Sequence, residues 1–163
     1  MPVYNAQTYL ADSISSILGQ TLKELELIIV NDCSTDDSLE LIKFFEEKDK
    51  RIKVIDLKEN GGMSNARNEG NKKASCDLIA VQDSDDISLQ TRLEKVVKFF
   101  KDNPDTDLLY TAYNIINPDN DVIAAMRADP FSIDSVFNEQ VTYAGHPTFV
   151  YKKKAILDVT YEN

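Results

Sequence analysis

Residues 78–86 have the sequence LIAVQDSDD, an apolar run that ends abruptly in the carboxylates of Asp83, Asp85 and Asp86. A short apolar segment bounded by polar residues is typical of a buried strand. Open α/β sheets bind their ligands at the carboxyl ends of the strands, so these carboxylates are expected to belong to a site. The same residues also fit a solvated turn that caps the following helix.

The closeness of these carboxylates favours a bound cation. Like charges repel, so keeping all three ionised is costly unless a positive charge lies among them. Ions such as Mg2+ take oxygen ligands, and in phosphate-handling sites they use one or two carboxylates together with phosphate oxygens and water. The sequence therefore favours a metal-assisted site for a phosphate-containing ligand.

The composition indicates one globular domain in 163 residues, 42% of them hydrophobic and 28% charged. A formal net charge of −10 argues against nucleic-acid binding, which normally needs a basic face. Cys33 and Cys76 lack metal-ligand spacing and predict reduced thiols in a cytoplasmic setting. No run approaches the ~18 apolar residues of a spanning helix, and no signal peptide is visible.

Strands and helices alternate along the chain as far as Pro104. The apolar spacing predicts a helix at 9–18, a strand at 25–30, a helix carrying Leu39, Ile42 and Phe45, a strand at 52–55, a helix at 63–74, the strand before the aspartates, and a helix that ends at Asn103. This order predicts an α/β fold with a doubly wound, mainly parallel sheet and helices on both faces.

Other expectations concern the two ends of the chain. Strands at 107–116 and 122–126 are expected to form a hairpin at the sheet edge, followed by a short helix at 131–137, a strand at 146–151 and a helix at 152–159. Pro2 suits the exit of a strand, but no strand precedes it. We therefore expect a single domain over 1–163 that lacks its first strand.

Parallel strands would bring the loops 2–5, 31–36 and 82–86 to one sheet edge, with Gly61-Gly62 beside them. Each loop also has a local interpretation. Asn5 and Asp32 could be helix caps, the two glycines could form a plain turn, and Arg67 could pair with Glu69 or face solvent. Caps alone do not explain why polar residues recur in all of these loops.

Four motifs now fall into a familiar order: PVYN at 2–5, VNDCSTDDS at 30–38, NGG at 60–62 with ARN at 66–68, and DSDD at 83–86. Together they resemble the successive motifs of family 2 glycosyltransferases, inverting enzymes with a GT-A nucleotide-sugar fold. A lone Asp-x-Asp is weak evidence, whereas four motifs in this order and spacing are specific. The resemblance covers nearly the whole chain.

The resemblance implies a role for each motif. Pro2, Tyr4 and Asn5 would line the base and ribose of a nucleotide, Asp32 would bind the uracil edge, and Arg67 would lie against the base or diphosphate. Asp83 would face the ribose and Asp85 would ligate Mn2+ or Mg2+. The nucleotide-sugar site would also include Asn60 and Ser84, and the candidates for the acceptor side are Asp86 and His146.

The resemblance further implies transfer from a UDP-sugar to an acceptor hydroxyl, with the metal stabilising the charge of the departing diphosphate. The acceptor would be a saccharide or a lipid-linked molecule in bacterial cell-surface polysaccharide synthesis, with the parent protein at the inner face of the plasma membrane. The base that takes the acceptor proton is expected beyond Asn163. Glu162 is the one carboxylate near that end.

Other functions compete with this one. A metal-dependent phosphotransferase with an aspartate nucleophile would carry Thr or Val two residues past the second aspartate, where this chain has Ile87. A nucleotidyltransferase would need a Gly-rich, basic first loop in place of PVYN. A nucleotide-sugar-binding module without turnover fits the same motifs, and sugar transfer by a longer version of the chain would separate it from an enzyme.

Overall fold

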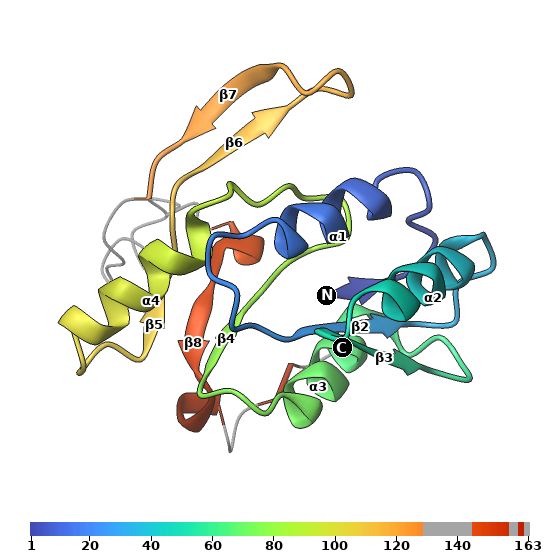
Figure 1. The fold of residues 1–163 in the computed structure, drawn as a ribbon, viewed down its shortest axis with the longest axis horizontal. Coiled ribbons are helices and arrows are strands. Elements are labelled where there is room, and N and C mark those ends of the chain that lie inside the picture. Colours follow the sequence, from blue (N-terminus) through green and yellow to red (C-terminus); the bar gives the residue numbers. More distant parts are fainter. Residues whose placement is uncertain (129–144, 157–159, 162–163) are drawn as a thin grey trace, which may run out of the picture.

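Three parallel strands form the first part of the fold. A computed structural model describes residues 1–128, 145–156 and 160–161. Strand β2 (Leu27–Asn31) lies between β1 (Pro2–Val3) and β3 (Ile52–Asp56), with Pro2 opposite Val30 and Leu27 opposite Ile52. Helices α1 (Leu10–Leu18), α2 (Ser38–Lys48) and α3 (Gly62–Lys73) follow these strands in turn (Figure 1). The predicted alternation of strand and helix is confirmed here.

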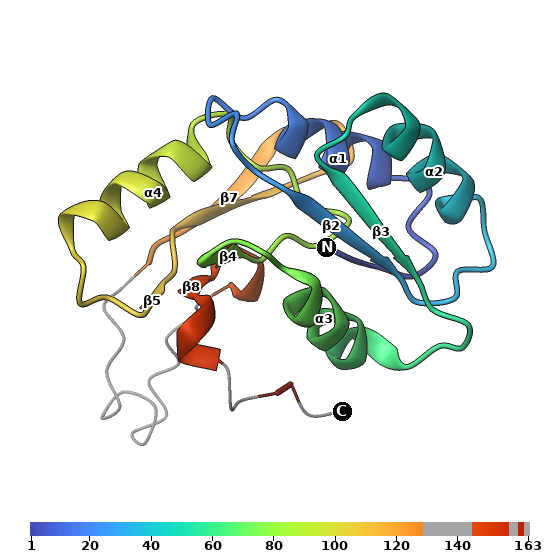
Figure 2. The ribbon, with the colours of Figure 1, turned by 60° about the horizontal axis from the view of Figure 1, so that its bottom comes forward.

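Helices cover both faces of this sheet because successive strand side chains point to opposite sides. Leu27 and Ile29 belong to a core cluster with residues of α1 and α2, namely Leu10, Ile14, Ile17 and Ile42. Val30 faces the other way, toward Gly70 of α3. Figure 2 shows α1 and α2 above the strands and α3 below them. The prediction of helices on both faces is confirmed.

A second sheet of three strands carries the aspartate segment. Its order is β4 (Leu78–Ala80), β8 (Val150–Lys152) and β5 (Leu108–Leu109), and both pairings are antiparallel. Helix α4 (Arg92–Asp102) covers it through Val96 and Phe100, which pack on Val150. The expected parallel pairing of β4 was wrong, because a strand from late in the chain pairs with it and apolar periodicity does not identify partners.

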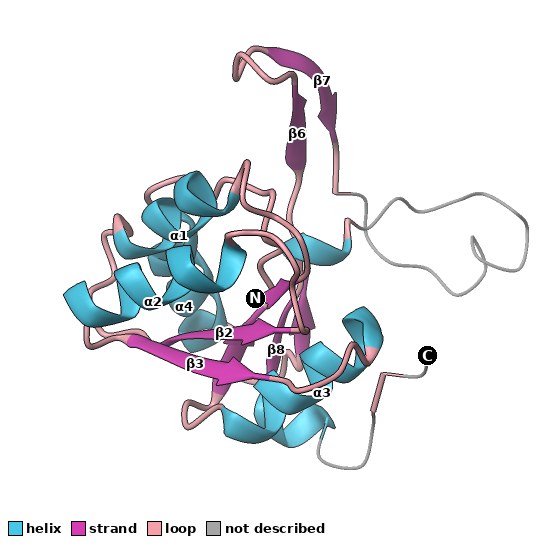
Figure 3. Ribbon diagram, turned by 90° about the vertical axis from the view of Figure 1, so that its right-hand side faces the viewer, coloured by secondary structure: helices cyan, strands magenta, loops and turns pink. Residues whose placement is uncertain are grey.

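The remaining described elements differ from the sequence expectations. The predicted strand at 107–116 divides between β5 and β6 (Tyr113–Ile116), and β6 pairs with β7 (Val122–Met126) in a separate two-stranded sheet. The hairpin is therefore present, but it extends away from the body rather than lying at a sheet edge (Figure 3). A 3-10 helix, η1 (His146–Thr148), replaces the start of the expected strand at 146–151, with Pro147 in its first turn.

The carboxyl-terminal part contains a second short helix. The 3-10 helix η2 (Lys153–Ile156) takes the place of the expected α-helix at 152–159, whose last residues lie outside the described ones. The expected helix at 131–137 and Glu162 also lie outside them. None of the helices in the described ranges is long and apolar enough to cross a membrane.

Candidate functional site

The loops after β1 and β2 are bonded to each other through Asn5. Its side-chain oxygen accepts a hydrogen bond from the Thr35 N–H at 2.8 Å, and its own N–H donates to Ser34 Oγ at 3.1 Å. Its φ of 50° lies in the left-handed region, which Asn tolerates. Helix α1 has Tyr9 at its N-cap and no side-chain cap, so the interpretation of Asn5 as a helix cap was wrong. The neighbouring Tyr4 is 52% exposed.

The buried carboxylate of Asp32 connects the end of β2 to the start of α3. One oxygen accepts the Gly61 N–H and the other accepts the Gly62 N–H, each at 2.8 Å. Asn60 Nδ2 donates to the backbone carbonyl of Asp32 at 3.1 Å. Gly62 has a φ of 82°, which side chains of L-residues rarely allow. Asp32 thus holds the start of α3, which is not the helix that follows it directly.

An ion pair joins α3 to the aspartate loop, residues 83–86. Arg67 Nη2 lies 2.9 Å from Asp83 Oδ1, and both side chains are largely buried. Glu69, the alternative partner of Arg67, pairs instead with Lys72. Within the described part of the chain, the buried Arg67 Nε has no hydrogen-bond partner. One donor of the guanidinium is therefore unpaired among these residues, next to the aspartate loop.

His146 lies against the same group of residues. Its Nε2 is 3.1 Å from the hydroxyl oxygen of Tyr161, whose backbone exchanges two hydrogen bonds with the Asn68 side chain. Burial lowers the pKa of His146, the positive charge of Arg67 lowers it further, and the negative charge of Asp83 acts in the opposite direction. The imidazole is therefore neutral at pH 7, and it lies within electrostatic reach of Arg67 and Asp83.

The aspartate loop concentrates negative charge, as its sequence predicts. Asp85 is exposed, whereas Ser84 and Asp86 are half-buried. Burial raises the pKa of Asp86 to about 6, Asp85 and Asp83 add to this effect, and Arg92 opposes it. Helix α4 starts only at Arg92 and has no side-chain cap, so the aspartates do not cap it.

The carboxylates of the aspartate loop could bind a metal ion that is also held by the phosphates of a nucleotide. In the described ranges, no group of three or more His, Cys, Asp or Glu side chains is placed to hold a metal ion. A Mg2+ or Mn2+ ion held partly by phosphate oxygens needs only one or two carboxylates. Asp85 is accessible for this role, and a cation there would relieve the repulsion among Asp83, Asp85 and Asp86, which adds to the effect of burial on the pKa of Asp86.

Two residues that organise this loop were missed from the sequence. Gln82 is buried, and its Nε2 donates to the backbone carbonyls of Asp83 and Asp86. Arg92 Nη1 donates to Gln82 Oε1. One signal was available, since a cation in the first turn of a helix opposes the helix dipole and calls for another partner.

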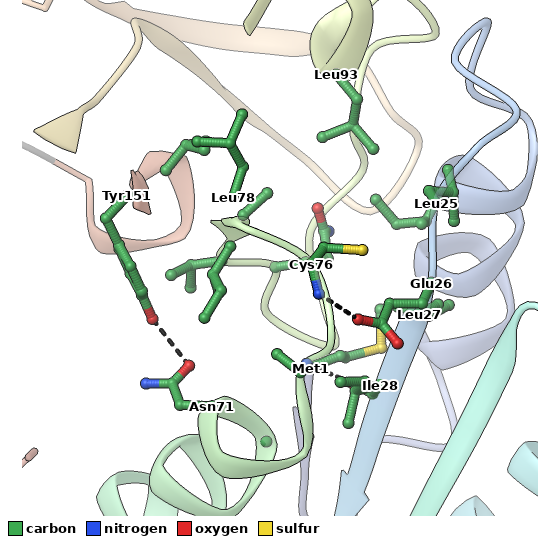
Figure 4. A pocket seen from close by; sticks show the side chains of 18 of the residues that line it. Met1, Leu25, Glu26, Leu27, Ile28, Asn71, Cys76, Leu78, Leu93 and Tyr151 are labelled. Atoms are coloured by element: carbon green, nitrogen blue, oxygen red, sulfur yellow. Dashed lines mark hydrogen bonds between the residues drawn. The ribbon is translucent and has the colours of Figure 1, made fainter. Parts of the chain in front are cut away.

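An apolar cavity of about 370 Å³ lies behind the site, between β2 and β4. Figure 4 shows side chains from both strands and from neighbouring elements around it, among them Leu25, Ile28, Leu78 and Leu93. At one end the cavity reaches Arg67 and Gln82. Its lining is mainly apolar, unlike the carboxylate-rich loop.

These motifs and their contacts agree with a comparison of the whole sequence with known families. The sequence model for glycosyl transferase family 2 matches residues 1–160. The chain belongs to this family. The resemblance of its four motifs is thereby confirmed, and so is the GT-A fold class, through the structural matches given below.

Family members from archaea and bacteria are similar in sequence. The uncharacterized glycosyltransferase MJ1057 of Methanocaldococcus jannaschii is 33% identical over 168 residues, which cover 99% of this chain and 57% of that protein. The putative teichuronic acid biosynthesis glycosyltransferase TuaG of Bacillus subtilis is 36% identical over 118 residues, covering 72% of this chain and 46% of that protein. The chain thus spans about half the length of these relatives.

Solved structures share the fold. S. aureus TarS 1-349 in complex with UDP-GlcNAc superposes with a TM-score of 0.76 at 26% identity, over 96% of this chain and 45% of that one. The mannosyltransferase PcManGT from Pyrobaculum calidifontis, in complex with GDP-Man and Mn2+, gives a TM-score of 0.71 at 17% identity, over 95% of this chain and 44% of that one. At this identity the second match concerns the fold alone.

Proposed function

We propose that this chain binds a UDP-sugar with Mn2+ or Mg2+, and that the whole protein transfers the sugar with inversion to a saccharide or lipid-linked acceptor. One observation carries the proposal: a series of contacts joins all four motifs. Asn5 bonds to Thr35, Asp32 bonds to Gly61 and Gly62, and α3 reaches the aspartate loop through Arg67. The similarity to TarS, solved with UDP-GlcNAc, supports a UDP-sugar as donor.

The proposed nucleotide contacts follow from exposure and charge. Tyr4 offers an accessible ring for the base, with Pro2 and Asn5 beside it. The exposed Asn60 and the turn held by Asp32 border the same region, and Asp32 is our candidate for the uracil edge. The residues proposed for the ribose and diphosphate are Asp83, Ser84 and Arg67, whose buried Nε has no hydrogen-bond partner among the described residues.

The proposed reaction breaks the bond between the anomeric carbon and the diphosphate oxygen while an acceptor oxygen bonds to the opposite face of that carbon. UDP departs, and a base takes the acceptor proton. Asp85 would hold the metal, which would supply positive charge to the departing diphosphate. Asp86 and His146 are our candidates for contacts with the sugar or acceptor. The base itself is expected beyond Asn163.

The similarity to TuaG supports a role in cell-surface polysaccharide synthesis. We place the whole protein at the inner face of the plasma membrane, where an activated nucleotide-sugar and a growing surface polymer would meet. Incubating a longer version of the chain with UDP-sugars and lipid-linked acceptors would test this, because release of UDP without sugar transfer would contradict the acceptor class.

Calorimetric titration with UDP, with and without Mn2+, tests the donor site. We expect binding that depends on Mn2+, that Asp85→Ala abolishes and that Asp119→Ala retains, since Asp119 is exposed in the hairpin turn. Equal binding by the two variants would contradict the metal role of Asp85. Sugar transfer by a longer version of the chain would separate an enzyme from a module that only binds nucleotide-sugars.

We also propose that β1, if lengthened at its amino end, would extend into the apolar cavity. The Met1 carbonyl accepts the Val30 N–H at 2.9 Å, and the Met1 amino group donates to the Ile28 carbonyl at 2.8 Å. The ladder with β2 therefore points toward Leu25 and Ile28, which line the cavity. Burial lowers the pKa of the Met1 amino group to about 5, whereas a peptide N–H there would carry no charge.

Two amino-terminal extensions test this domain proposal. Four residues alternating between Val and Ile should fill the cavity, pair with β2 and raise the melting temperature by several degrees. A Gly-Ser extension of the same length is the control, because it buries little apolar surface. Equal melting temperatures for both would contradict the proposal.

A further inference from the structure

Arg92, the first residue of α4, lies at the centre of a buried hydrogen-bond network behind the aspartate loop. Its Nη1 donates to Gln82 Oε1 at 3.1 Å and to Ser88 Oγ at 2.9 Å. Its Nη2 donates to the carbonyls of Val81 at 3.0 Å and Pro147 at 2.9 Å. A single guanidinium therefore bonds to the segment that follows β4 and to the η1 turn.

Gln82 connects Arg92 to the aspartate loop by hydrogen bonds. Its Nε2 donates to the Asp86 carbonyl at 2.7 Å and to the Asp83 carbonyl at 3.2 Å, while its Oε1 accepts from Ser88 Oγ at 2.6 Å. Only 4% of Gln82 is exposed, and its bond with Ser88 is buried, while its bonds to the Asp83 and Asp86 carbonyls are partly buried. The Gln82 amide thus fixes both ends of the loop that presents Asp85.

Helix α1 supports the loop from another side. Ser13 Oγ donates to the Asp83 carbonyl at 3.0 Å, and the Ser88 N–H donates to Ser16 Oγ at 3.0 Å. Gln20 Nε2 also donates to the Leu89 carbonyl at 2.9 Å. Among the described contacts, the η1 turn has no such support from α1. The Val81 N–H donates to the carbonyl of Phe149, just after η1, and the Arg92 side chain bonds both to η1 and to the loop network.

We infer that Arg92 is a positioning residue that, through Gln82 and Pro147, sets the aspartate loop relative to the η1 turn carrying His146. This inference rests on the proposed function in one respect: the positioned carboxylate, Asp85, is the proposed metal ligand. Residues that orient metal ligands from behind typically change metal affinity about 10–100-fold when substituted. Arg92 would thus affect metal-dependent nucleotide binding without contacting the metal ion or the nucleotide.

Arg92→Lys tests the inference, because lysine keeps the charge but cannot direct two pairs of donors in a fixed plane. We expect the enhancement of UDP affinity by Mn2+ to fall about tenfold, while UDP affinity in EDTA changes less than about twofold. The matched control is Arg51→Lys, because Arg51 bonds to Asp49 and the Leu18 carbonyl, away from the aspartate loop. An unchanged enhancement in folded Arg92→Lys overturns the inference, and so does an equal loss with and without Mn2+.

Hydrogen exchange provides a readout that does not depend on nucleotide. In Arg92→Lys the amides of Asp86, Thr148 and Phe149 should all exchange faster than in Arg51→Lys, because the loop and the turn lose their shared anchor. Faster exchange in a chain that binds no UDP would support the positioning role and contradict the proposed function. Unchanged exchange at both segments overturns the inference.

A milder variant covers the case in which Arg92→Lys does not fold. Ser88→Ala removes the hydroxyl that donates to Gln82 and accepts from Arg92, and leaves the guanidinium in place. We expect about a threefold loss of the Mn2+ enhancement and faster exchange at Asp86. Wild-type behaviour in both measurements overturns the inference.

Discussion

Strands β1, β2 and β3 pair with strands that are close to them in the sequence, whereas β4 begins a sheet in which Leu78 pairs with Lys152. The first region packs two helices against one face of a parallel sheet and forms the larger of the two described core clusters. The second has fewer buried residues and depends on a strand that comes late in the chain. The proposed site lies between them, and Arg67 of the first region pairs with Asp83 of the second.

The comparison shows that both regions contribute to one site but are stabilised by different contacts. Parallel strands linked by short helices are assembled from local sequence, and their buried surface is continuous. The second region closes only after β8 is in place, which requires contacts between residues far apart in the chain. We therefore expect the first region to be the more stable of the two.

Truncating one core residue in each region gives the most direct test. Ile29→Ala should lower the free energy of unfolding by about 3–4 kcal/mol, because Ile29 is fully buried in the larger cluster. Val150→Ala should lower it by about 2 kcal/mol, because valine is smaller than isoleucine and Val150 belongs to the smaller cluster, so the substitution removes fewer buried contacts. Urea unfolding followed by circular dichroism measures both. A larger loss for Val150→Ala would reverse the ranking of the two regions.

Asp32→Ala tests the polar contacts of the first region. Removing the carboxylate leaves the Gly61 and Gly62 N–H groups without their acceptor in a buried place, which should cost about 2–3 kcal/mol. Asp37→Ala is the control, because Asp37 is exposed and makes no side-chain cap for α2. It should change the free energy of unfolding by less than about 0.5 kcal/mol. Similar losses for both variants would contradict the bridging role of Asp32.

Glu26→Gln tests a connection between the two regions. Glu26, next to β2, accepts hydrogen bonds from the Ser75 and Cys76 N–H groups, which come just before β4. Burial acts to raise the pKa of Glu26, but the hydrogen bonds from Lys53 and Ser75 outweigh it and lower the pKa to about 2. At pH 7 the substitution should lower the free energy of unfolding by about 1–2 kcal/mol.

The effect of Glu26→Gln on the free energy of unfolding should depend on pH. A lowered carboxyl pKa contributes stability above the ordinary value of 4.5, and the contribution is lost as the pH falls from there toward 2. The difference between wild type and Glu26→Gln should therefore shrink over that range. Glu24→Gln, at an exposed position, is the control and should show no such convergence. A difference that stays constant down to pH 2 would contradict the assigned contacts.

The smallest predicted effects concern two glycines of α3 and have opposite signs. Gly62→Ala should lower the free energy of unfolding by about 1 kcal/mol, because φ at this position is 82°. Gly70→Ala should raise it by about 0.5 kcal/mol, since the added Cβ would make only an ordinary contact with Val30, at 3.4 Å, within a helix. Thermal melts of both variants measure these shifts. Equal signs would mean that the strain at Gly62 is not what the backbone geometry indicates.

The sequence predicted the first region well because its signals are local. The apolar run around Leu27 and Ile29 and the helical spacing of Leu10, Ile14 and Ile17 each lie within one element. The order of strands and loops also predicted that the motif loops lie near one another, but it did not predict the pairing of Arg67 with Asp83. The role of each residue in nucleotide binding stays a prediction.

The sequence could not predict features that depend on distant partners. Nothing near Leu78 indicates that β8 will pair with it, and the run at 107–116 gives no sign that it divides between two sheets. Gln82 and Arg92 were missed for the same reason, because their partners include Ser13 and Pro147, which become their neighbours only after folding. The Arg67–Glu69 alternative failed because a buried carboxylate from another element was available.

The Asp32 carboxylate at the start of α3 limits which groups can bind the negative charge of a diphosphate. Helix N-termini are ready-made anion sites, because their first N–H groups lack partners within the helix. Here the protein's own anion occupies those of Gly61 and Gly62, so they are not available to a diphosphate. A nucleotide bound beside them must find its positive charge elsewhere, in a divalent ion and in Arg67. That requirement would make donor binding sensitive to chelators and comparatively insensitive to changes at the start of α3 that leave the fold intact.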